Sequence, residues 1–130
     1  MSQHLGAVAL VIRDYDEAKA YYCGTLGFTI MNDVDMGAGK RWVTLMPPGS
    51  GPTRFLLAKA ATPIQSAAIG NQAGGRVFVF LHTDDFWRDY NIYKSRGVLF
   101  REEPRHEPYG IVAVFEDLYG NLWDLLQPAG

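Results

Sequence analysis

Apolar residues near the start of the chain follow first the pattern of a strand and then that of a helix. Residues 5–13 are β-rich and apolar at adjacent positions, which is typical of a strand buried on both faces. Asp14 comes next, and an aspartate there can cap a helix by accepting hydrogen bonds from free backbone N–H groups. Apolar side chains then recur at helical spacing, at Ala18, Tyr21, Tyr22 and Leu26. Gly27 is placed to end this helix.

Three further strands complete the first half of the pattern. We expect them at residues 28–34, at residues 41–46 and at Arg54–Lys59, separated by turns rich in glycine and proline. The composition changes in residues 60–75, which lack the alternation of a strand. They can hold one helical turn, and their Gly, Asn and Gln residues are typical of a linker.

The same order of elements begins again after this linker. Residues 76–83 predict a strand, and Asp84 is placed to cap a helix that ends at Gly97. Three more strands are expected, at residues 98–101, 111–116 and 122–127. The first two of these are joined by a predicted loop, PRHEPYG, and the last two by a tight turn, DLYGN.

The repeat predicts an α+β fold built from two βαβββ modules. Asp14 and Gly27 recur as Asp84 and Gly97, at an offset of 70 residues. Two such halves usually form one pseudosymmetric domain, so we expect curved mixed sheets around a shared cleft. The expected single domain spans residues 1–130, with module one at about 4–60, the linker at about 61–75 and module two at about 76–128.

Composition and charge exclude several classes of partner. The 130 residues carry a net charge of −2, so no basic field is available to hold nucleic acid. The longest apolar run without glycine is residues 7–12, whereas a membrane span needs about 20 residues. The start of the chain lacks the pattern of a secretion signal, and a single cysteine, Cys23, permits no internal disulfide. We therefore expect a cytoplasmic protein.

Both ends of the chain resemble the vicinal oxygen chelate superfamily, which includes glyoxalase I, extradiol dioxygenases, fosfomycin-resistance enzymes and bleomycin-resistance proteins. The segments that carry the resemblance are AVALVIRDYDEAKAYYCGTLGF at the start and VAVFEDLYGNLWDLLQP at the end. The resemblance implies paired βαβββ modules, a ligand cavity between curved sheets and a homodimer. It does not fix the reaction, because this fold hosts metal enzymes and plain binding proteins alike.

The usual metal ligands of this superfamily are mostly replaced in the sequence. The resemblance places the four ligand positions at Ala7, at Arg54 or Phe55, at Val77 and at Asp124. Only Asp124 offers an oxygen, whereas zinc takes about four ligands and magnesium or manganese about six. We therefore expect no cofactor at the usual site. A divalent metal at a relocated site made by His4, Glu116 and His106 stays open.

Alternation along the strands predicts which side chains line the cleft. In the first strand, Ala7, Ala9 and Val11 should face the cleft, and the bulkier residues between them should lie beneath the helix. In the last strand, Asp124 should face the cleft between Leu122 and Leu126. In the first strand of the second module, the same argument assigns Val77, Val79 and Leu81 to the cleft, which leaves Phe80 and His82 on the helix side.

Asp124 is the strongest functional candidate. A carboxylate in an apolar cleft is costly unless it is paired, hydrated or protonated. It can meet a ligand, act as a general base together with Glu116, or form a salt bridge to Arg41 or Arg54. Three aromatic side chains could also stack on a flat ligand, those of Trp42, Phe55 and Tyr109.

The sequence supports three functional hypotheses. The first is a homodimeric protein that binds a small, partly apolar or aromatic molecule without a metal, with ligand contacts from Ala7, Ala9, Trp42, Phe55, Val77, Tyr109 and Asp124. The second is a divergent lyase or isomerase of the glyoxalase type that uses Asp124 or a relocated metal. The third is a partner-dependent protein that keeps the fold but has lost the site.

Overall fold

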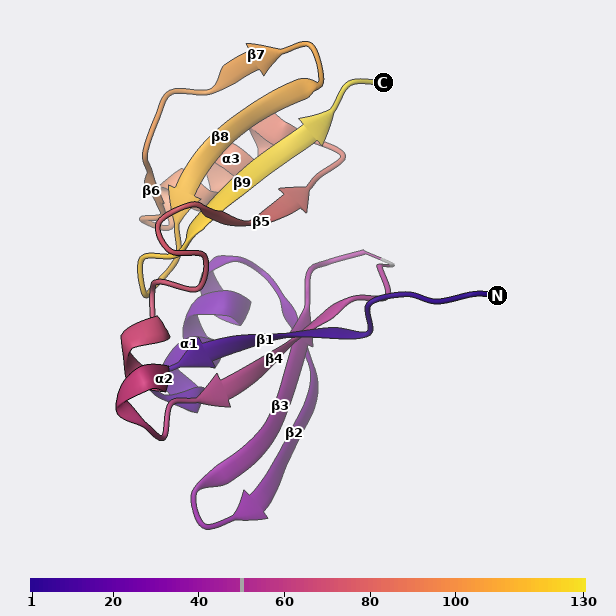
Figure 1. The fold of residues 1–130 in the computed structure, drawn as a ribbon. Helices are drawn as coiled ribbons and strands as arrows, with labels where there is room; N and C mark the ends of the chain where they lie inside the picture. The colour runs from indigo at the N-terminus through magenta and orange to yellow at the C-terminus, as the bar shows by residue number, and fades with distance from the viewer. Residues whose placement is uncertain (50) are drawn as a thin grey trace. The chain divides into compact units, whose positions relative to one another are not determined.

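The computed structural model of the chain describes residues 1–49 and 51–130. These residues form two compact units, residues 1–69 and 70–130. Each unit contains one mixed β-sheet with at least one helix beside it, as Figure 1 shows. The α+β class and the repeated βαβββ order are thereby confirmed, with one short additional strand in the second unit.

The first unit contains a four-stranded sheet in the order β1-β4-β3-β2. Its strands are β1 (Ala7–Ile12), β2 (Thr29–Gly37), β3 (Lys40–Met46) and β4 (Arg54–Lys59). β1 and β4 run parallel, and the other pairs are antiparallel. β2 ends three residues later than the pattern predicts. It continues to a tight turn in which Gly37 and Gly39 have positive φ values of 85° and 78°, so β2 and β3 form one long hairpin.

The helices of the first unit begin where side chains accept hydrogen bonds from free backbone N–H groups. Asp14 caps α1 (Tyr15–Lys19) by accepting from the Glu17 N–H at 2.8 Å. The predicted single helix continues as a π-helical turn, η1 (Ala20–Thr25). Within the expected linker, α2 (Pro63–Ala68) is capped in the same way by Thr62.

The second unit contains a five-stranded sheet in the order β5-β9-β8-β6, with β7 also paired to β8. Its strands are β5 (Val77–His82), β6 (Leu99–Phe100), β7 (Arg105–Glu107), β8 (Gly110–Glu116) and β9 (Leu122–Pro128). β5 and β9 run parallel. β7 corrects the expectation that PRHEPYG is only a loop, because three of its residues pair in antiparallel register with β8.

The helix of the second unit, α3 (Phe86–Ser95), begins one residue later than predicted. Asp85, and not Asp84, is its cap and accepts from the Arg88 N–H at 3.1 Å. The Thr83 hydroxyl accepts from the Asp85 N–H, which fixes the turn before the helix. Asp84 instead pairs with the Arg88 guanidinium at 2.8 Å.

Each sheet has a face packed under helices and an opposite face, called the open face below. In the first unit, Leu10 and Ile12 are completely buried on the helix side, and Ala7 and Ala9 lie on the open face. In the second unit, Phe115 lies against Tyr93 of α3 on the helix side, with ring centroids 5.6 Å apart.

Candidate functional site

Asp124 lies on the open face of the second sheet, as the alternation predicts. Its neighbours Trp123 and Leu125 are buried on the helix side, where Trp123 stacks on Phe115. Asp124 pairs across the sheet with Val114 of β8. The carboxylate therefore lies in the middle of the sheet among apolar side chains.

The Asp124 carboxylate is buried and incompletely paired. The residue is only 9% exposed, and its Oδ1 is the single buried side-chain oxygen or nitrogen without a hydrogen-bond partner among the described residues. Burial raises the pKa of Asp124, and the nearby negative charge of Glu102 adds to this, while Arg105 opposes it. Such an acceptor is costly to bury, so the site favours a molecule that donates a hydrogen bond to it.

Arg105 is the cation that acts on Asp124, and the sequence pattern did not identify it. It lies on β7 opposite Val112, which places it on the open face. Its Nε is 2.5 Å from Glu102 Oε2, and its Nη1 is 2.8 Å from Glu107 Oε1. Arg105 is thus largely neutralised by two other carboxylates. The signal that could have revealed it is the alternation of Arg105 and Glu107 within a segment assigned to a loop.

Tyr109 lies beside this cluster. It is exposed and hydrogen-bonds the Arg105 side chain, and after the bond to Glu102 this bond also holds the pKa of Arg105 above its usual value. The structure therefore brings one of the predicted aromatic contacts to the edge of the sheet that carries Asp124.

A register shift in β5 corrects part of the predicted cleft face. Val77 pairs with Leu122 and stays on the open face, but the register shifts by one residue before Val79. As a result Phe80 lies opposite Asp124, and it is 62% exposed. Val79 and Leu81 lie opposite Trp123 and Leu125 on the helix side, and His82 joins Phe80 on the open face. The sequence assigned these four residues to the wrong faces because its period of two assumed a regular strand.

Glu116 lies on the same face of the sheet as Asp124 and has a charged partner of its own. It lies opposite Leu122, near the end of β8, and its carboxylate pairs with the Arg101 guanidinium. His106 lies opposite Ile111 on the helix side, with its ring centroid 6.4 Å from that of Trp87. Glu116 therefore shares the open face with Asp124 but is paired with Arg101, whereas His106 lies on the opposite face of the sheet.

The open face of the first sheet carries a second set of predicted residues. Ala7 pairs with Arg54, and Ala9 pairs with Leu56, so these four side chains share the face. Trp42 lies on it too, because it alternates with the buried Val43. Phe55 does not. It lies on the helix side and stacks on Phe28, with ring centroids 6.4 Å apart.

Both arginines proposed as salt-bridge partners of Asp124 have contacts within the first unit. Arg41 is 2.8 Å from Asp33 and 2.9 Å from Asp16. The bond from Arg41, together with one from Lys19, holds the pKa of Asp33 below its usual value. Arg54 Nη1 lies 3.4 Å from Asn32 Oδ1.

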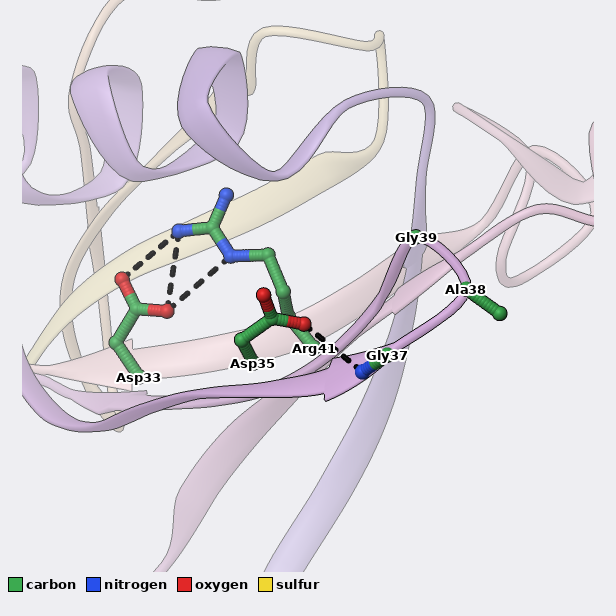
Figure 2. Close-up of a pocket in the computed structure, with 6 residues that line it drawn as sticks. All are labelled: Asp33, Asp35, Gly37, Ala38, Gly39 and Arg41. Carbon is green, nitrogen blue, oxygen red and sulfur yellow. Dashed lines mark hydrogen bonds and ion pairs between the residues drawn. The ribbon is translucent and has the colours of Figure 1, made fainter.

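A hollow at the tip of the β2–β3 hairpin is lined by Asp33, Asp35, Gly37, Ala38, Gly39 and Arg41. Figure 2 shows that its charged groups already have partners: Arg41 bonds Asp33, and Asp35 accepts from the Gly37 N–H at 2.8 Å. This hollow is separate from the open face with Ala7 and Ala9. We assign no ligand to it.

The residues at the usual metal positions do not fit a metal. Register between β1 and β4 places Arg54, and not Phe55, beside Ala7, so a cation stands where a ligand is usual. Within residues 1–49 and 51–130, no three His, Cys, Asp or Glu side chains form a group that could hold a metal ion. We therefore derive no chemistry through a metal.

The DLYGN turn holds the strand that carries Asp124. Asp117 Oδ1 accepts from the backbone N–H groups of Tyr119, Gly120 and Asn121. Its Oδ2 accepts from Asn121 Nδ2 and from Trp123 Nε1, both at 3.0 Å. By fixing Trp123 on the helix side, Asp117 also sets the direction of the next residue, Asp124.

No helix in the described part of the chain is long and apolar enough to cross a membrane.

Comparisons with known proteins agree with this architecture. A protein of Shewanella frigidimarina (strain NCIMB 400) is 55% identical over 128 residues, which cover 98% of this chain and 95% of that protein. The crystal structure of UcmS2 matches with a TM-score of 0.83 and 30% identity, over 97% of this chain and 98% of that one. That of TnmS3, an antibiotic binding protein from Streptomyces sp. CB03234, matches with a TM-score of 0.79 and 29% identity, over 98% of each chain.

The family model for the Glyoxalase/Bleomycin resistance protein/Dioxygenase superfamily matches residues 4–125, nearly the whole chain. Together with the two mixed βαβββ sheets, this match establishes that the chain belongs to that superfamily.

Proposed function

We propose that this protein binds a small, partly apolar or aromatic molecule and does so without a metal. The observation that carries the proposal is the unpaired Oδ1 of Asp124, buried on the open face of the second sheet. The ligand would donate a hydrogen bond to this oxygen from a cationic or N–H group. Shape and burial are sufficient for such binding, and no reacting group is required.

The surroundings of Asp124 support an aromatic or apolar body for the ligand. Phe80 lies opposite Asp124, largely exposed, and Val77 lies on the same face. An aromatic ring beside a carboxylate suits a flat cation, because the ring face and the carboxylate both attract positive charge. The description of TnmS3 as an antibiotic binding protein is consistent with a ligand of this kind.

The proposal can be tested with two flat molecules of the same outline. 9-Aminoacridine is a cation with N–H donors at neutral pH, whereas acridine is largely neutral. Calorimetric titration should show that the wild type prefers 9-aminoacridine. Asp124→Asn should weaken binding of 9-aminoacridine by roughly 1.5–3 kcal/mol, the range for a hydrogen bond to a charged group.

Glu116→Gln is the matched control. It removes a carboxylate from the same sheet face, but that carboxylate pairs with Arg101, so affinity should stay within about twofold of the wild type. Equal affinity of the wild type and Asp124→Asn for 9-aminoacridine would refute the proposed role of Asp124.

The enzyme alternative would give a different result in the same variant. If Asp124 is a general base in a lyase or isomerase, Asn should abolish turnover and leave substrate affinity nearly unchanged, because an amide keeps the shape but takes up no proton. The raised pKa of Asp124 is the feature that keeps this alternative in view.

Metal independence is tested directly by elemental analysis. Protein purified without chelators should contain far less than one Zn, Ni, Mn or Fe per chain, because Ala7, Arg54 and Val77 replace the usual ligands. About one tightly bound metal per chain would overturn this part of the proposal. So would a melting temperature that rises sharply with one divalent ion.

We further infer a cytoplasmic homodimer. Exposed apolar side chains, including Trp42 and Phe80, support an assembly that covers them. Light scattering at micromolar concentration should give the mass of two chains, and a monomer mass across that range would contradict the inference.

A further inference from the structure

The open face of the first sheet contains a cluster of hydrogen-bond donors made by Asn32, Thr44 and Arg54. The Thr44 hydroxyl donates to Asn32 Oδ1 at 2.6 Å, and Arg54 Nη1 lies 3.4 Å from the same oxygen. Thr44 is only 3% exposed, so the cluster is built into the sheet and is not a chance surface contact.

The geometry places the Arg54 guanidinium over the middle of the sheet. Arg54 is on β4 and Asn32 is on β2, and β3 lies between these two strands. To reach Asn32, the Arg54 side chain must therefore cross β3 on the open face. The side chain beside its starting point is only a methyl group, that of Ala7.

The Asn32 side-chain oxygen of this cluster is used, whereas the Asn32 amide nitrogen and the other guanidinium nitrogens of Arg54 have no hydrogen-bond partner among the described residues. Asn32 Oδ1 already accepts from two groups, which directs the Asn32 amide nitrogen away from both of them. Among the described residues, no carboxylate forms a salt bridge with Arg54, unlike Arg41, which has two such partners. The cluster thus presents a cation and an amide donor, a combination that suits an acceptor with negative charge.

Apolar groups surround these donors. Asn32, Thr44, Leu56 and Ala9 pair in one row across β2, β3, β4 and β1. Trp42 precedes Thr44 by two residues on the same face, which corresponds to about 7 Å along a strand, and it is 45% exposed. A flat apolar body can therefore lie beside the charged groups.

We propose that Arg54 and Asn32 form a binding site for the carboxylate of an aromatic acid whose ring packs near Trp42 and Leu56. Guanidinium and carboxylate form paired N–H···O bonds, and an apolar surround strengthens them. The site belongs to the first unit and does not depend on Asp124, so it can be tested independently of the donor-binding role proposed above.

1-Naphthoate and 1-naphthamide are suitable probes, because they share a ring system and differ in charge. Calorimetry should show binding of 1-naphthoate to the wild type and much weaker binding of the amide. Arg54→Gln should weaken 1-naphthoate binding roughly 10- to 100-fold, as expected for loss of a charged hydrogen bond, and leave 1-naphthamide unaffected. Lys59→Gln is the matched control, since it removes an exposed positive charge from the same strand at a position opposite Ile12, on the other face.

A second variant keeps the test valid if Arg54→Gln folds poorly. Asn32→Asp retains Arg54 but supplies it with an internal carboxylate, so it should also abolish 1-naphthoate binding, with a circular dichroism spectrum like that of the wild type. Asp124→Asn should leave 1-naphthoate affinity unchanged, which separates this site from the one in the second unit. The inference is overturned by undetectable 1-naphthoate binding up to millimolar concentration, by equal affinity for the amide, or by an Arg54→Gln variant that folds and binds as the wild type does.

Discussion

Two buried aspartates stand seven residues apart near the end of the chain, and their surroundings are opposite. Asp117 is 6% exposed, and its two oxygens accept five hydrogen bonds from the turn and from Trp123. Asp124 is about as deeply buried, yet its Oδ1 has no hydrogen-bond partner among the described residues. Equal burial therefore does not mean an equal role.

The contrast distinguishes a structural carboxylate from one available to a ligand. Each donor to Asp117 is a group that the fold itself must satisfy, so removing this carboxylate leaves several polar groups unpaired. Removing the Asp124 carboxylate leaves nothing in the described structure unpaired. Stability should therefore depend on Asp117, and binding should depend on Asp124.

The largest expected effect is that of Asp117→Ala. Loss of an acceptor for three backbone N–H groups, an amide and an indole should lower the free energy of unfolding by about 3–5 kcal/mol. Urea denaturation monitored by circular dichroism measures this change. A loss below about 1 kcal/mol would show that water replaces Asp117 without difficulty, and the contrast would then fail.

Asp124→Asn should have a much smaller effect on stability, with the opposite sign or none. It replaces a buried charge that lacks a full set of partners by a neutral amide of the same shape. We expect the free energy of unfolding to stay equal or to rise by up to about 1 kcal/mol in the same urea experiment. A clear fall would reveal a structural partner of Asp124 and would make the two aspartates alike.

The smallest effect concerns pH. Because the folded pKa of Asp124 is raised above the usual value of 3.8, the folded state holds this proton more tightly than the unfolded state does. The wild type should therefore lose stability relative to Asp124→Asn as the pH rises from about the unfolded pKa through the raised folded pKa. Urea midpoints of both proteins across this range measure the difference, and a difference that does not vary with pH would contradict the raised pKa.

Much of the fold follows from local sequence patterns. Asp14 and Gly27 mark the beginning and end of the first helical segment, and Arg54–Lys59 is a strand with the predicted bounds. These features depend on neighbours within a few residues, through capping and through hydrophobic alternation. The sequence also identified DLYGN as a turn, although it gave no reason to single out Asp117.

The sequence predicted the site less completely than the fold, because the site depends on how the strands pair. Ala7, Ala9, Trp42, Val77 and Asp124 lie on open faces, but Phe55 packs on Phe28 and His106 lies near Trp87. A one-residue choice of register left Arg54 and Phe55 equivalent in the sequence. Pairing with β1 resolves it, because only Arg54 lies opposite Ala7.

The sequence by itself determined most element types, the repeated order and the direction of Asp124, since each follows from periodicity along one segment. Only the tertiary structure decided that Phe80 shares a face with Asp124, that the charge of Arg105 acts on Asp124, and that Arg54 crosses the sheet to Asn32. These facts arise from a register shift in β5, a short strand within an expected loop, and a contact between residues on different strands. The physical reason is that side-chain contacts across a sheet depend on interstrand register, and a shift of one residue moves a side chain to the opposite face.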